Sequence, residues 1–159
     1  MSKLLIAYYS RTGNTAQMAE AVARGAASVP GAQVQTRPVE SLTPEDLLAC
    51  DALILGSPVY YGGPAAEIKA LLDASAIYHG KLDGKVGGAF ATGGVVGGGM
   101  ETTVLDLIHA LLVHGMIVKG ESGGAHFGAV AVGAPDDAAA SACERLGRSV
   151  ATLAQRLFG

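Results

Sequence analysis

The stretch AYYSRTGNTAQMAEAV, residues 7–22, joins the end of an apolar run to the start of a helical pattern. The apolar run, residues 3–9, is typical of a strand that is buried on both faces. Residues 15–29 place apolar side chains at the spacing of an α-helix. The turn between them, Ser10–Thr15, carries three hydroxyls, an amide and a glycine. A strand that passes through such a turn directly into a helix predicts the first unit of an α/β fold.

The rest of the chain continues this alternation. Strand patterns occupy residues 32–39, 51–60, 85–92, 115–120 and 128–135, and helical patterns occupy residues 43–50, 65–75, 100–114 and 135–158. Mostly apolar strands separated by helices imply a parallel sheet that is covered on both faces. About five such units in 159 residues predict a single domain over residues 1–159. We expect a flavodoxin-like, doubly wound, five-stranded parallel sheet with the strand order 2-1-3-4-5.

Composition and charge exclude several classes of protein. Half of the residues are hydrophobic and 16% are charged, which argues against disorder. A net charge of −3 offers no basic footprint for nucleic acid. No apolar run reaches the roughly 20 residues that cross a bilayer, and no signal-peptide pattern is present, so we expect a cytoplasmic protein without a membrane span. Cys50 and Cys143 show no metal-ligand spacing; we expect reduced, buried thiols and no metal site, with redox or metal chemistry as the alternative.

The expected fold also predicts where a ligand binds. In doubly wound sheets the ligand lies outside the carboxyl ends of the strands, where the strand order reverses. In the order 2-1-3-4-5 this point lies between the first and the third strand. Three loops reach it: Ser10–Thr15, Ser57–Gly63 and Ala91–Met100.

The first loop has the chemistry of a phosphate site. Free N–H groups at a helix N-terminus and the helix dipole favour a dianionic phosphate. The P-loop pattern and the dinucleotide fingerprint G-x-G-x-x-G are both absent from this loop. The alternative is a well-capped helix, but capping uses one hydroxyl and this loop has three. The predicted phosphate ligands are Ser10, Arg11, Thr12, Gly13, Asn14 and Thr15.

The motifs resemble those of a known family. The segment SRTGNT after a first strand resembles the flavin mononucleotide (FMN) phosphate loop of flavodoxin-like proteins. The segments GSPVYYGGPAAEIKALLD (56–73) and ATGGVVGGGMETTVLDLIHALLVHGMIV (91–118) are similar to one branch in particular. That branch is the NAD(P)H:quinone oxidoreductases related to the tryptophan-repressor-binding protein. The resemblance implies FMN as the cofactor, NAD(P)H as the electron donor and a quinone or similar small molecule as the acceptor.

By the same resemblance, the second and third loops hold the isoalloxazine ring. The implied contacts are Ser57, Pro58, Val59, Tyr60, Tyr61 and Gly62 in the second loop, and Ala91, Thr92, Gly93 and Gly94 in the third. Two alternatives stay open: the tyrosines could be core aromatics, and the glycine-rich third loop could be a flexible surface loop. The family pattern is carried no further than Gly94 because Val95 and Val96 are extra.

Two histidines complete the implied site. His114 matches a family histidine that approaches the quinone, where it could donate a hydrogen bond or proton; the alternative is a residue at a helix C-terminus. His126 is expected to cover the site together with Phe127. The segment 121–125 is shorter than the corresponding family loop, which helps to build a tetramer, so a homo-oligomer (dimer or tetramer) is an open expectation.

Three hypotheses for function follow. The first is an FMN-dependent enzyme that takes a hydride from NAD(P)H and reduces a quinone by two electrons. The second is a flavodoxin-type carrier that moves single electrons between proteins, and the third is an accessory FMN-binding domain. Carriers are usually acidic around the flavin, whereas the three loops contain no aspartate or glutamate. The sequence therefore favours the enzyme.

Overall fold

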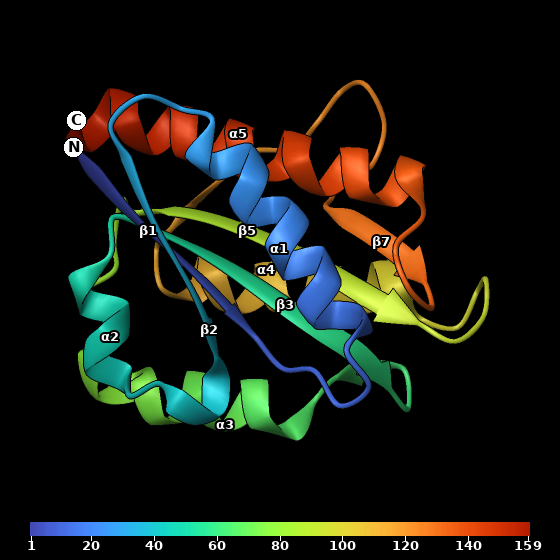
Figure 1. Cartoon of the computed structure of the whole chain (residues 1–159). Coiled ribbons are helices and arrows are strands. Elements are labelled where there is room, and N and C mark those ends of the chain that lie inside the picture. The colour runs from blue at the N-terminus through green and yellow to red at the C-terminus, as the bar shows by residue number, and fades with distance from the viewer.

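A parallel sheet forms the middle layer of the molecule, with helices on both faces (Figure 1). The computed structural model describes residues 1–159. The path through the sheet is β2-β1-β3-β5-β6. The strands are β1 (Ser2–Tyr8), β2 (Ala32–Pro38), β3 (Ala52–Tyr60), β4 (Gly63–Pro64), β5 (Val86–Gly93), β6 (Ile117–Val118) and β7 (Ala129–Val132). Setting the short antiparallel strand β4 aside, this order confirms the predicted doubly wound sheet.

The fifth position of the sheet is shared by two short strands. Strand β6 pairs with the first residues of β5, where Val86 lies opposite Ile117, and β7 pairs with its last residues, where Gly93 lies opposite Val132. The predicted strand at 115–120 is therefore only two residues long. The intervening residues 119–128 leave the sheet and form a loop beside the last helix (Figure 1).

Helices cover the two faces in two sets. Helices α1 (Asn14–Ala27) and α5 (Asp137–Phe158) pack on one face, while α2 (Pro44–Ala49), α3 (Ala66–Ala74) and α4 (Met100–Val113) pack on the other. Short 3₁₀ turns lie at Val39–Ser41 and Ser75–Tyr78. Alternate strand residues point to opposite faces, so buried β1 residues divide between the two cores. The side toward α1 and α5 receives Leu4 and Ile6, and the other receives Leu5 and Ala7.

Helices α1 and α5 approach each other at two glycines. A Cβ atom on Gly25 would overlap the main chain of Glu144, and one on Gly147 would overlap the main chain of Val22. Glycine is the residue that permits so close a helix contact. This contact fixes α1, whose N-terminus carries the predicted phosphate loop, against the long C-terminal helix.

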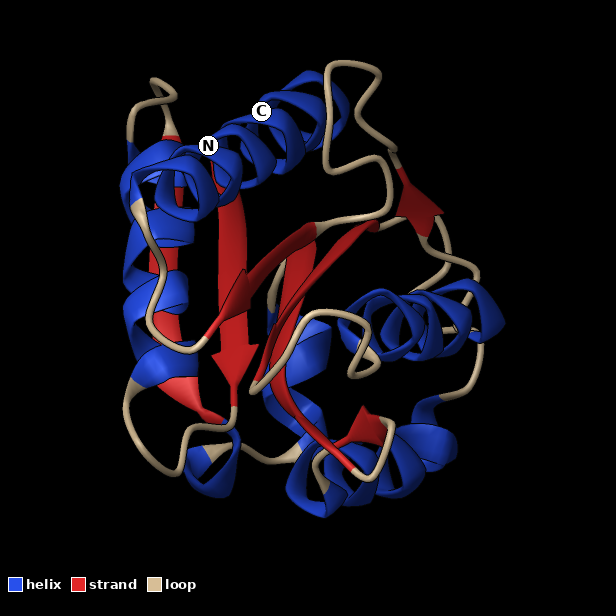
Figure 2. Cartoon of the chain, turned by 90° about the vertical axis from the view of Figure 1, so that its right-hand side faces the viewer, coloured by secondary structure: helices blue, strands red, loops and turns tan.

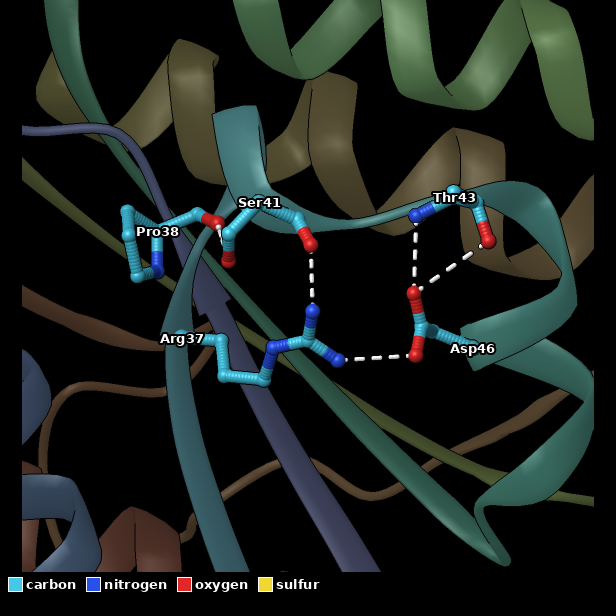
Figure 3. A network of polar contacts seen from close by, with 5 residues as sticks. All are labelled: Arg37, Pro38, Ser41, Thr43 and Asp46. Atoms are coloured by element: carbon cyan, nitrogen blue, oxygen red, sulfur yellow. Dashed lines mark hydrogen bonds and ion pairs between the residues drawn. The ribbon is translucent and has the colours of Figure 1, made fainter.

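A polar network fastens the end of β2 to α2 (Figure 3). The Arg37 guanidinium donates to Asp46 at 2.7 Å and also to the carbonyl oxygen of Ser41. The second oxygen of Asp46 accepts the backbone N–H of Thr43 at 2.8 Å, which makes a capping box at the start of α2. These hydrogen bonds lower the pKa of Asp46, and the bond from the Thr43 backbone has the largest effect. These contacts hold the end of the edge strand β2 against the start of α2.

The hairpin after β3 was not predicted. Strand β4 turns back on β3 in antiparallel pairing, with Val59 opposite Pro64 and Tyr60 opposite Gly63. The two turn residues, Tyr61 and Gly62, both have positive φ angles, 48° and 83°. A two-residue hairpin needs this conformation so that its turn follows the twist of the strands. The sequence signal, a glycine after a tyrosine, is weaker than the usual Asn-Gly.

Candidate cofactor site

The three predicted loops meet at the carboxyl edge of the sheet, which faces the viewer in Figure 2. They enclose a cleft of about 430 Å³. This volume lies in the range of small-molecule and cofactor sites. Its lining consists of Arg11, Thr12, Asn14, Thr15, Pro58, Val59, Tyr60, Thr92, Gly93, Gly94 and Gly133. Every one of these residues except Gly133 is a predicted site residue.

The first loop presents free amide groups to this cleft. Ser10 Oγ accepts the backbone N–H groups of Gly13 and Ala16, both at 3.2 Å. The N–H groups of Asn14 and Thr15, at the start of α1, have no partner in the protein. No acidic residue occupies the first turn of α1. Together with the helix dipole, this arrangement suits an anion.

Ser10 and Gly13 therefore stabilise the shape of the first loop. Neither residue lines the cleft, because the Ser10 hydroxyl is turned inward to the backbone of its own loop. Gly13 has a φ of 96°, a left-handed conformation that lets the chain turn sharply into α1. Because the Ser10 hydroxyl still has its own proton to donate, a direct contact from Ser10 to a phosphate stays a prediction.

The electrostatic character of the cleft comes from Arg11. It is the only charged residue in the lining, it is exposed, and it forms no ion pair within the chain. No aspartate or glutamate lines the cleft. An anionic ligand, or one that becomes anionic when it is reduced, meets no opposing charge there.

Two hydroxyls connect the first loop to the third. Thr15 Oγ1 and Thr92 Oγ1 lie 2.8 Å apart, and both side chains are buried. Thr15 belongs to the first turn of α1, and Thr92 to the end of β5. The hydrogen bond fixes the spacing between the loop that suits a phosphate and the loop that is expected to hold the ring.

In the second loop the serine is structural and the tyrosines face solvent. Ser57 is fully buried; its Oγ accepts the N–H of Ala65 at 2.8 Å, next to the start of α3, and it does not line the cleft. Tyr61, at the tip of the hairpin, is fully exposed, and Gly62 beside it is also exposed. Tyr60 is partly exposed, and its ring packs edge-on against that of Tyr9, with 6.3 Å between the ring centroids. The interpretation of the two tyrosines as core aromatics is thereby excluded.

The third loop lines the cleft with two glycines, Gly93 and Gly94, which have no side chains. A Cβ atom on Gly93 would lie 2.6 Å from Met100 Cγ, whereas one on Gly94 would have nothing within 4 Å. Val95 and Val96, which follow, are 62% and 87% exposed. Ala91, a β5 residue, is buried in the core between the sheet and helices α2, α3 and α4, and it does not line the cleft.

Gly133 is the one lining residue outside the predicted site residues. Its N–H donates to the carbonyl oxygen of Gly93 at 2.8 Å, so the end of β7 lies against the third loop. The signal was present in the Gly-Ala-Pro turn at residues 133–135, directly after the last strand pattern. A strand that occupies the fifth position brings its following loop to the same edge as the other three.

His114 lies at the opposite edge of the sheet. It caps the C-terminal end of α4, which begins at the cleft and runs back to the amino edge, where Ile117 pairs with Val86. Its ring Nε2 is 2.9 Å from Ser75 Oγ, and the side chain is buried. Burial lowers the pKa of His114, and the nearby His79 lowers it further. The prediction that His114 acts at the site within its own chain is wrong.

His126 also lies away from the cleft. It belongs to the loop between β6 and β7, where its Nδ1 is 2.7 Å from the carbonyl oxygen of Glu121. Ala129 follows closely and pairs with Phe90, near the middle of β5. His126 does not line the cleft, and Phe127 faces a separate hollow against α5. The expectation that these two residues cover the site is therefore corrected.

Neither cysteine belongs to this site. Both thiols are buried and free, and burial raises the pKa of Cys50 to about 11 and that of Cys143 to about 12. Such thiols stay protonated and unreactive near neutral pH. No group of three or more histidine, cysteine, aspartate or glutamate residues suited to a metal ion exists in the molecule.

The fold and the cleft together define a class. A doubly wound sheet carries, at its switch point, an anion-binding helix N-terminus beside a glycine-walled cleft; this is the arrangement of a flavodoxin-like mononucleotide protein. The donors fit FMN: amides at Asn14 and Thr15 and a hydroxyl at Thr12 for a phosphate, and open backbone at Gly94 for a flat ring. The chain belongs to the family of NADPH-dependent FMN reductases, whose model matches residues 42–129.

Individual relatives extend over the whole chain. A flavodoxin of Aquifex aeolicus is 38% identical and aligns with 95% of this chain and 86% of its own length. A protein of Archaeoglobus fulgidus named NAD(P)H dehydrogenase (quinone) is 31% identical over 191 aligned residues, which include 99% of this chain and all of the relative. The crystal structure of a WrbA-like flavodoxin from Agrobacterium tumefaciens superposes with a TM-score of 0.83 at 27% identity, covering 98% of this chain and 99% of that one.

These comparisons support the recognised family and its cofactor. The chain is an FMN-binding oxidoreductase of flavodoxin-like fold. Its relatives carry two kinds of name, flavodoxin and NAD(P)H dehydrogenase (quinone), which correspond to the carrier and the enzyme. No helix in the structure combines the length and hydrophobicity needed to span a membrane.

Proposed function

We propose that this protein oxidises NAD(P)H and reduces a quinone by two electrons, with FMN as the cofactor. The observation that carries the proposal is the absence of any carboxylate from the lining of a cleft that holds Arg11. Exposed apolar residues directly follow lining residues in the sequence: Tyr61 follows Tyr60, and Val95 and Val96 follow Gly94. A flat, apolar acceptor can pack against such side chains, and no carboxylate in the lining opposes the negative charge that it gains on reduction.

The residues of the cleft divide the work of holding FMN. In this proposal the amides of Asn14 and Thr15 and the hydroxyl of Thr12 bind the phosphate, and Arg11 adds a positive charge. Pro58, Val59 and Tyr60 contact one side of the flavin and Thr92, Gly93 and Gly94 the other, as the family resemblance implies; Tyr61 and Gly62 stand at the outer edge. When bound, FMN supplies the redox chemistry by accepting a hydride and passing on two electrons.

The protein's own contribution is orientation and charge. Thr15 and Thr92 keep the first and third loops at a fixed separation, so both ends of the cofactor are held at once. In this proposal, the exposed hairpin tip and the exposed Val95–Val96 segment flank the place where a second ring system stacks on the flavin. Arg11, together with the missing carboxylates, favours the accumulation of negative charge on reduction.

The carrier is the second candidate. It is favoured by the 38% identity to a protein named flavodoxin. Carriers of single electrons dock on partner proteins through charged surfaces, usually acidic ones, around the cofactor. The loops of this cleft offer Arg11 and apolar side chains instead. This difference is our reason for placing the enzyme first.

The decisive experiment measures turnover. Purified, FMN-loaded protein is mixed with NADH or NADPH, with and without benzoquinone, and nicotinamide oxidation is followed over time. The proposal expects oxidation of one or both nucleotides that depends on benzoquinone, and little turnover after FMN is removed. If neither nucleotide is oxidised, while the protein exchanges electrons rapidly with a one-electron redox protein, the carrier is the function.

A further inference from the structure

A second concave site lies along the outer face of α5. It is a groove of about 350 Å³, and four of its seven lining residues carry a positive charge: Lys119, Arg145, Arg148 and Arg156. Two hydroxyl side chains, Ser149 and Thr152, lie between them. No acidic residue lines the groove, although the chain as a whole has a net charge of −3.

The spacing along α5 brings these side chains together. Arg148, Thr152 and Arg156 follow one another at intervals of four residues, so they stand on adjacent turns of one helix face. Arg145 and Ser149 form a neighbouring row with the same spacing. Lys119 approaches from the end of β6, across from the helix. The three arginines are exposed, while the opposite face of α5 is buried against the sheet.

Most of this charge is not neutralised within the chain. Only Arg145 has an ion pair, with Glu121 at 2.6 Å. Arg148 donates to the hydroxyl of Ser28, and Lys119 to the carbonyl oxygen of Gly120. Arg156 has no hydrogen-bond or ion-pair partner. The unpaired charges of Arg148 and Arg156 stand two turns apart on one face of α5, so an anion between them is attracted by both.

We propose that this groove binds a phosphate group, carried by a small phosphorylated molecule or by a phospholipid head group. Arginine forks match phosphate oxygens, and the hydroxyls of Ser149 and Thr152 supply further donors between the charges. The groove also continues, through Lys119 and Ser149, into the small hollow lined by the exposed Phe127.

The groove is separate from the cofactor cleft. Helix α5 starts at Asp137, four residues beyond Gly133 in the cleft lining. At about 1.5 Å per residue, Arg148 lies ~16 Å and Arg156 ~28 Å further along the helix. The phosphate of a nucleotide bound in the cleft therefore cannot occupy this groove, and the inference does not depend on the function proposed for the cleft.

The test uses the full chain saturated with FMN, so that the first loop is filled, and two probes. Inorganic pyrophosphate is titrated calorimetrically, and vesicles of phosphatidylglycerol with phosphatidylcholine are compared with phosphatidylcholine alone by flotation. The variant Arg148→Gln/Arg156→Gln should weaken binding by ~tenfold or more, because it removes two charge-assisted contacts. The control Lys3→Gln/Lys81→Gln removes the same charge from exposed positions outside the groove and should change binding less than about twofold.

Each outcome has a definite meaning. Pyrophosphate binding that is lost in the groove variant supports a small phosphorylated ligand, and vesicle binding alone that is lost there supports the lipid head group. Equal losses in both double variants would mean that only net charge matters, and this would overturn the inference. Wild-type protein that binds neither probe would overturn it as well. If the protein proves unable to hold FMN, the same comparison on the protein without it still decides the matter.

Discussion

The hydroxyls of Thr15 and Thr92 lie 2.8 Å apart, although 77 residues separate them in the chain. Their hydrogen bond is buried and joins the N-terminus of α1 to the end of β5. Thr92→Val should cost ~1–3 kcal/mol in the free energy of unfolding, because it leaves the Thr15 hydroxyl unpaired. Thr15→Val/Thr92→Val should cost less than the sum of the single variants. Urea denaturation of all three variants measures the coupling; additive costs would show that the hydroxyls act independently.

The phosphate loop predicts a preference for FMN over riboflavin. Without a phosphate, a ligand gains nothing from the amides of Asn14 and Thr15 or from the Thr12 hydroxyl, so riboflavin should bind much more weakly. Thr12→Ala should weaken FMN binding by ~1.5–3 kcal/mol, the value of a hydrogen bond to a charged group. Riboflavin affinity should stay unchanged.

Fluorescence titration with both flavins measures these affinities. Thr36→Ala is the matched control, because Thr36 is an exposed threonine on β2, remote from the cleft lining. Equal affinity of the wild-type protein for FMN and riboflavin would show that Ser10–Thr15 does not bind the phosphate.

Two adjacent glycines give a matched pair of substitutions. Gly93→Ala puts a methyl group 2.6 Å from Met100 Cγ, so it should cost ~1–3 kcal/mol through overpacking. Gly94→Ala meets nothing within 4 Å, so its effect on unfolding should stay within about 0.5 kcal/mol. Yet Gly94 lines the cleft, and its new methyl group should weaken FMN binding. Thermal unfolding with and without FMN separates the two effects; a Gly94→Ala variant with normal FMN affinity would place the ring elsewhere.

The fold was predictable because its signals are local and mutually consistent. Each buried strand pattern is followed by a helical one, and parallel pairing brings their intervening loops to one edge. That rule alone placed the loops at 10–15, 57–63 and 91–100 in a common cleft. What the pattern could not give is the direction of each side chain. Ser10 and Ser57 turn inward to backbone N–H groups, and this depends on turn geometry that the sequence does not display.

The errors on the histidines have a different origin. A helix that connects parallel strands must return from the carboxyl edge to the amino edge, so its last residue lies far from the ligand. His114 ends such a helix, so its place in the fold outweighs the match to a family histidine near the flavin, as far as a single chain is concerned. His126 lies in the loop that interrupts the fifth strand, and β6 and β7 are too short for the sequence pattern to locate that interruption. The oligomeric state stays a prediction.

The last prediction concerns the role that His114 does have. Its ring is buried beside Ser75, its Nδ1 atom has no hydrogen-bond partner, and its pKa is lowered by burial and then by His79. The carboxylate of Asp83 lies beside Gly115, the residue after His114. Folding thus favours the neutral imidazole.

The direction of the pH effect follows from this. Between the lowered folded pKa and the ordinary value near 6.5, the unfolded chain binds the proton more readily than the folded one. The stabilising contribution is therefore complete above about pH 6.5 and is lost as the pH falls through the folded pKa. His114→Gln should flatten the decline in the free energy of unfolding on acidification, as measured by urea denaturation between neutral and mildly acidic pH. His109→Gln, at an exposed position on the same helix, is the control and should keep the wild-type slope. If the slopes of wild type and His114→Gln coincide, the buried imidazole is not the group that titrates on unfolding.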